Sequence, residues 1–147
     1  MRISLLFTLM LLICLATFAC KDYSTGLQQS SGRADETSAI ATLRTLAQAQ
    51  TTYSISNAGH FATFEQLAEG GFLNSRFHHA SPELHGYIFT LKVSPATDTT
   101  PGSYTCNADP APTSPSGGRH FYIDSNSQDI RMNPTKQATS KDQILRP

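Results

Sequence analysis

The sequence predicts an α+β domain, in which a long N-terminal helix and a short helix pack on an antiparallel sheet of three or four strands. Two observations lead to this fold class. Apolar residues recur at helical spacing over residues 39–53, and after Gly86 the spacing changes to a period of two. Because the helices come first and the strands then follow one another, the strands are expected to form an antiparallel meander covered by the long helix.

The segment AIATLRTLAQAQTTY, residues 39–53, predicts the long helix. Its apolar side chains fall on one narrow stripe, in which Gln50 fills a gap, so the helix needs a surface to pack against. Asp35 is the expected N-cap, and the polar residues from Ser54 onward favour termination. We expect the core to combine this stripe with the strands: Ile40, Leu43, Leu46 and Tyr53 against Phe89, Leu91, Tyr104 and Phe121.

The segment TFEQLAEGG, residues 63–71, predicts the short helix. Thr63 and Gln66 have the spacing of a capping box, and Gly70 and Gly71 end the pattern. Four later stretches predict strands: GYIFTLKV (86–93), SYTCNA (103–108), RHFYID (119–124) and QDIRM (128–132). The polar tail, residues 133–147, is expected to fray.

The first 19 residues have the organisation of a secretory signal peptide. Met1-Arg2 precedes an uncharged apolar run, residues 3–19, which ends in small residues at Ala19. The run is also long enough to suggest an uncleaved membrane anchor, but the polar KDYSTG that follows favours cleavage. Residues 20–34 are small and polar and predict a flexible tether before a globular domain at residues 35–132.

Cys20 lies at the expected cleavage point and resembles the lipid-modified cysteine of bacterial lipoproteins. Lipidation would anchor the domain to a membrane of the cell envelope. Ordinary cleavage after Ala19 is the alternative, which leaves a periplasmic or secreted protein whose Cys20 can pair with Cys106. If Cys20 carries lipid, Cys106 is most simply a small buried side chain.

The charge balance excludes one class of partner. The chain carries 11 basic and 11 acidic residues, and cleavage removes Arg2, so the exported part has no basic footprint for nucleic acid. We therefore expect the partners to be envelope proteins. We expect the protein to contact the membrane only through lipid on Cys20, and we expect no cofactor.

No constellation for catalysis is recognised. Serines are abundant but none lies in a Gly-x-Ser-x-Gly elbow, and the strand alternation places Cys106 toward the core. The histidines lack metal-site spacing, so no metal is expected. Asp124, Asn126 and Asp129 form the one oxygen-rich cluster and are candidate calcium ligands, although a hairpin turn explains the same composition.

The segment DPAPTSPSGG, residues 109–118, predicts a loop and a possible contact site. Its prolines Pro110, Pro112 and Pro115 restrict the chain and reduce the freedom lost on binding. A plain spacer between strands has the same composition.

The string DETSAIATLRTLAQAQTTYSISNAGHFATFEQLAEGGFL resembles the helix and following loop of type IV pilin-like and type II secretion pseudopilin globular domains. The later GYIFTLKV, SYTCNADP and RHFYIDSNSQDIR resemble the strands of that domain, so the resemblance covers roughly residues 35–132. The prepilin leader of that group, with its Gly-Phe junction and glutamate, is replaced here by a lipoprotein-like signal. The residues that carry the resemblance are Ala39-Ile40, Leu43-Arg44, Tyr53, Gly59-His60-Phe61 and Leu67.

The resemblance implies a non-enzymatic cell-envelope protein with a structural or protein-interaction role in or beside a type IV pilus or type II secretion system. The alternative is a lipid-anchored periplasmic or surface binding module that uses a pilin-like scaffold without any filament. That alternative predicts a pocket near residues 72–86.

Overall fold

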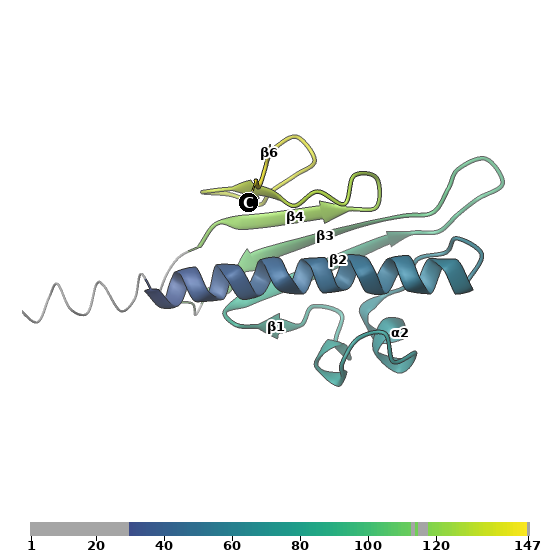
Figure 1. Cartoon of the computed structure of the whole chain (residues 1–147), viewed down its shortest axis with the longest axis horizontal. Coiled ribbons are helices and arrows are strands. Elements are labelled where there is room, and N and C mark those ends of the chain that lie inside the picture. The colour runs from purple at the N-terminus through teal and green to yellow at the C-terminus, as the bar shows by residue number, and fades with distance from the viewer. Residues whose placement is uncertain (1–29, 113, 115–117, 147) are drawn as a thin grey trace, which may run out of the picture.

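The computed structural model describes residues 30–112, 114 and 118–146. Within them the chain has the expected α+β class, with helices first and an antiparallel sheet after them. The long helix (residues 30–56) lies along the sheet, and the short helix α2 (Phe64–Glu69) and the 3-10 turn η1 (Ser75–Phe77) lie on the β1 side (Figure 1).

The sheet has six strands in the described part of the chain, so the expected number of three or four was wrong. The strands follow chain order, and every neighbouring pair is antiparallel. All four expected strands are present, and the two additional ones are edge strands of two residues each. The strands are β1 (Glu83–Leu84), β2 (Tyr87–Ser94), β3 (Ser103–Pro110), β4 (His120–Asp124), β5 (Arg131–Asn133) and β6 (Gln143–Ile144).

The long helix extends further in both directions than the apolar stripe indicated. Residues 30–34, which were assigned to the tether, are already helical, so Asp35 is not the N-cap. Thr37 and Ser38 donate their hydroxyls to the carbonyls of Arg33 and Ala34, one turn earlier. The helix then continues to residue 56, three residues beyond Tyr53.

The end of the long helix uses the left-handed backbone region. Ala58 and Gly59 have φ of 52° and 81°, and the Gly59 amide donates to the Ser54 carbonyl at 2.9 Å. A residue in this region after the last turn is a common helix C-terminal motif. The chain then reaches α2, where Thr63 and Gln66 form the expected capping box.

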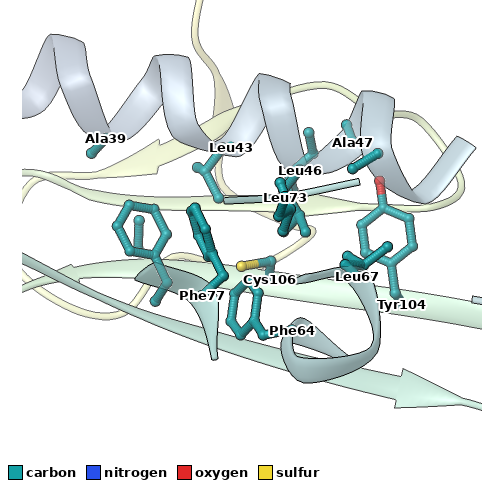
Figure 2. Close-up of a cluster of buried hydrophobic side chains, with 14 of the residues drawn as sticks. Ala39, Leu43, Leu46, Ala47, Phe64, Leu67, Leu73, Phe77, Tyr104 and Cys106 are labelled. Atoms are coloured by element: carbon teal, nitrogen blue, oxygen red, sulfur yellow. The ribbon is translucent and has the colours of Figure 1, made fainter. Parts of the chain in front are cut away.

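The core lies between the long helix and the sheet, with α2 closing it at one side. Leu43 and Leu46 are buried from the helix, and Phe89, Tyr104 and Phe121 are buried from the strands, as expected. Figure 2 shows Leu43 and Leu46 over Cys106, with Phe64 beneath. Each fully buried large side chain contributes roughly 1.5–3 kcal/mol. Three other expected core residues are only partly buried against this cluster: Ile40, Tyr53 and Leu91.

The C-terminal segment is folded through residue 144 instead of fraying after residue 132. β6 pairs with β5, and Ala138 is 2% exposed. Asn107 donates from its side chain to the Ala138 carbonyl at 2.7 Å. The Asp142 carboxylate accepts from Thr139 and Asn133, and these hydrogen bonds hold its pKa below the usual value. Polar contacts hold this segment in place, and hydropathy does not show them.

Candidate functional site

The expected contact loop, residues 109–118, begins two residues later than its composition indicated. Asp109 and Pro110 are the last residues of β3, opposite Ile88 and Tyr87 of β2. Pro112 is exposed in the turn that follows, and Pro115 lies outside the described residues. Of the three prolines proposed for contact, Pro112 is therefore described on the exposed turn, while Pro110 closes a strand.

Where the chain returns from this loop, an ion pair joins the sheet to the long helix. Arg119 donates to the Glu36 carboxylate from its backbone amide at 3.0 Å and from two guanidinium nitrogens at 3.1 and 2.8 Å. Burial alone would raise the pKa of Glu36, but the hydrogen bonds and charge of Arg119 outweigh it and lower that pKa. Glu36 is thus a carboxylate held by a forked donor.

Tyr87 and Gly118 hold the backbone of this turn in place. The Tyr87 hydroxyl donates to the Arg119 carbonyl at 3.0 Å. Burial, reinforced by the charge of Glu36, raises the pKa of Tyr87. A Cβ atom on Gly118 would overlap the Tyr87 hydroxyl, so glycine is required here for close approach.

His120 and Asp109 form a second polar pair beside the first. The His120 Nδ1 lies 2.6 Å from Asp109 Oδ1, and Gln137 donates to the other carboxylate oxygen at 2.7 Å. With Glu36 and Arg119 these residues form what we call the corner site. It borders a shallow depression of about 550 Å³, lined by Glu36, Pro110, Gly118, Arg119, His120, Pro134 and Thr135.

In the corner site the His120 imidazole is oriented by the Asp109 carboxylate. The arrangement can present a guanidinium, an imidazole and carboxylates to a polar partner, and it holds the loop and helix together.

The corner site does not show in the local sequence pattern. Glu36 and Arg119 are 83 positions apart, so local spacing carries no trace of their contact. The contact between His120 and Asp109 follows from strand register. The β3–β4 register places Ala108 opposite Phe121, so Asp109 lies opposite His120. A polar pair at directly opposed positions of neighbouring strands is a usable signal once that register is known.

A second concavity lies between the long helix and the segment 72–86, and we call it the helix groove. Its volume is about 290 Å³. Phe77 is 4% exposed and Leu84 is half-buried, whereas Arg76 and His85 are exposed. The remaining lining residues are Ser38, Ala41, Thr42, Thr45 and Asn74.

The calcium candidates form a turn. Asp124 is buried, and its Oδ1 accepts the backbone amides of Asn126 at 2.9 Å and Ser127 at 3.0 Å. Asn126 and Asp129 are exposed. Over the described residues no group of three or more His, Cys, Asp or Glu side chains is placed to hold a metal ion. The hydrogen bonds of Asp124 match the hairpin-turn interpretation of this cluster.

Of Cys20 and Cys106, only Cys106 lies among the residues that the structure describes. Cys20, the proposed lipidation site, lies outside the described residues, as do the signal peptide (1–19) and tether residues 20–29. Cys106 is a free thiol with no exposed surface, and burial raises its pKa. Among the described helices, none is long and apolar enough to cross a membrane.

Comparisons with models of protein families, with curated proteins and with solved structures found no match to this chain.

Proposed function

We propose that this chain is a non-enzymatic cell-envelope protein with a pilin- or pseudopilin-like head. Its role is protein–protein contact in or beside a type IV pilus or type II secretion system. Lipid on Cys20 anchors it to the envelope membrane in this proposal. Without lipid it is periplasmic or secreted.

The observation that carries the proposal is the two-sided long helix. One face, with Leu43 and Leu46, is buried against the antiparallel sheet. The opposite face stays exposed along the helix and ends at Ile55, whose 80% exposure is the highest among the large apolar side chains described. We call this the outer helix face, and it comprises Arg44, Gln48, Thr52 and Ile55.

The order of elements supports the same proposal. A long helix, a short capped helix and an antiparallel meander follow one another, which is the order that the resemblance implies. An apolar side chain as exposed as Ile55, on a helix that is otherwise polar on that side, is a reasonable centre for a protein contact.

In-cell photocrosslinking tests the proposal. A photoreactive residue at Gln48 probes the outer helix face, and one at Glu69, exposed on α2, serves as the matched control position. Capture of pilus or secretion components from Gln48 and not from Glu69 supports the role. A photoreactive residue at Thr52 gives a second position on the same face. The proposal is contradicted if the products captured from Gln48 and from Thr52 contain no component of either system.

The helix groove favours a second candidate function, the envelope binding module without a filament. This alternative predicted a pocket near residues 72–86, and Asn74, Arg76, Phe77, Leu84 and His85 of that segment line the groove. A concave site with an apolar floor and a few polar groups is the usual form of a small-molecule site.

A further inference from the structure

We propose that the helix groove binds a small organic acid. Its anionic group lies beside Arg76 and His85, and its apolar part lies on Phe77 and Leu84. This inference deepens the second candidate function and does not depend on a role in a filament.

The floor of the groove is apolar and held in place. The Phe77 ring packs on Phe64 with centroids 5.5 Å apart and is almost completely buried. Leu84 belongs to β1, whose register against Tyr87 of β2 sets its position. A preformed apolar surface reduces the ordering cost of binding.

The positive charge in the groove comes from Arg76. His85 also lines the groove, and the lining contains no aspartate or glutamate. Glu83 precedes Leu84 on β1, so its side chain points to the opposite face of the strand. Asp35 lies beside Gly86, outside the lining. In the described residues neither the Arg76 guanidinium nor the His85 ring has a hydrogen-bond or ion-pair partner.

The backbone of His85 is in an uncommon conformation. His85 and Gly86 form the two-residue turn between β1 and β2, with φ of 51° and 71°. Two positive φ angles define the hairpin turn that favours Asn-Gly. Histidine suits the first position of this turn less well than asparagine does. The turn places the imidazole of His85 at the groove.

The helix wall of the groove gives the site its polarity. The hydroxyls of Ser38, Thr42 and Thr45 donate to carbonyls one turn earlier, so each presents only acceptor lone pairs to the groove. An anionic group is therefore received by Arg76 and His85 and not by the helix. At about 290 Å³ the groove is at the small end of ligand sites, which fits one small acid.

Backbone-amide NMR titration of the full chain in nonionic detergent tests this site with three probes. These are 3-phenylpropionate, its neutral carboxamide, and inorganic phosphate. We expect 3-phenylpropionate to cause saturable shifts at residues 74–77 and 84–86. The carboxamide, which lacks the charge, is expected to bind at least about tenfold more weakly. Phosphate, which lacks the apolar part, is also expected to bind more weakly.

Paired variants separate the groove from general charge effects. Arg76→Gln and Arg44→Gln remove the same charge, inside the groove and on the outer helix face. His85→Asn removes the imidazole and keeps a residue that suits the turn, and His79→Asn is its exposed control. We expect Arg76→Gln to weaken 3-phenylpropionate binding about tenfold and His85→Asn severalfold, with both controls within about twofold.

Four results would overturn the inference. They are the absence of saturable shifts at these residues, equal affinity for the acid and its carboxamide, equal effects of Arg76→Gln and Arg44→Gln, and phosphate binding as tight as that of the acid. None of these results bears on crosslinking from Gln48, so failure here and failure of the filament role are distinguishable.

Discussion

The side chain of Gln50 pairs with both backbone groups of Ala62. Its Nε2 donates to the Ala62 carbonyl at 2.7 Å, and its Oε1 accepts from the Ala62 amide at 3.0 Å. Gln50 and Ala62 have no exposed surface. The polar gap in the apolar stripe is therefore a clamp, which joins the long helix to the residue before the cap of α2.

Replacing Gln50 tests this clamp. Gln50→Leu keeps the approximate size of the side chain but leaves a buried amide and a buried carbonyl of Ala62 without partners. Since each such group costs roughly 1–3 kcal/mol, we expect a loss of about 2–4 kcal/mol in the free energy of unfolding. Urea denaturation measures it, with Gln48→Leu on the exposed face as the control. Equal midpoints for the two variants would show that the clamp contributes nothing.

Leu43 is the most direct test of the core assignment. Leu43→Asp places a carboxylate at a position with no exposed surface, inside the apolar core cluster, and a buried unpaired charge is not tolerated. We expect no cooperative unfolding transition by circular dichroism. Arg44→Asp, one residue further along and exposed, is expected to retain the transition. A Leu43→Asp protein that still melts cooperatively would refute the core.

The fold was predictable from the sequence where burial repeats. Tyr104, Cys106 and Ala108 alternate along β3 and are all buried. In the long helix, Leu43 and Leu46 are buried at the spacing that the apolar stripe predicted. The two-residue strands β1 and β6 are too short to show a period. β1 exists because the turn at His85 folds it onto β2, and β6 because the Leu145 amide reaches the Ile130 carbonyl.

The candidate sites were less predictable because they depend on distant partners. Residues 30–34 are helical but carry no apolar stripe that would predict a helix. The Arg119–Glu36 contact joins residues far apart in the sequence, so local spacing does not predict it. A pocket was expected near residues 72–86 and the groove lies there, but its helix wall comes from Ser38, Thr42 and Thr45, polar residues that are not part of the apolar stripe. A pattern of burial identifies a core and says little about surfaces.

Two buried tyrosines should respond in opposite ways to loss of the hydroxyl. Tyr87 donates its hydroxyl to Arg119, whereas the Tyr104 hydroxyl is buried with no partner among the described residues. We expect Tyr87→Phe to destabilise by about 1 kcal/mol and Tyr104→Phe to be neutral or stabilising. Thermal unfolding of the two variants side by side checks this. A larger loss for Tyr104→Phe would mean that its hydroxyl has a partner in solution.

Gly118 should not accept a methyl group. In Gly118→Ala the new Cβ overlaps the Tyr87 hydroxyl, and overpacking of this kind typically costs roughly 1–3 kcal/mol. Combining it with Tyr87→Phe removes the overlapping atom, so the double variant should lose less than the two single losses added together. Chemical denaturation of all four proteins measures the coupling. Strict additivity would place the cost of the alanine elsewhere in the turn.

The Glu36–Arg119 pair should make stability depend on pH on the acidic side. The pKa of Glu36 lies below its ordinary value of 4.5 in the folded chain because the hydrogen bonds of Arg119 outweigh burial. The stabilisation is therefore complete above 4.5, where both states are ionised, and is lost as pH falls through the folded pKa. With Glu36 mostly buried and Arg119 partly exposed, we expect Glu36→Gln to cost about 1–2 kcal/mol at neutral pH.

Unfolding free energies over a pH series should show the gap between wild type and Glu36→Gln closing below pH 4.5. Glu69→Gln, at an exposed position, is the control for the loss of one carboxylate. A gap that stays constant into acid would mean that the carboxylate charge of Glu36 does not stabilise the fold.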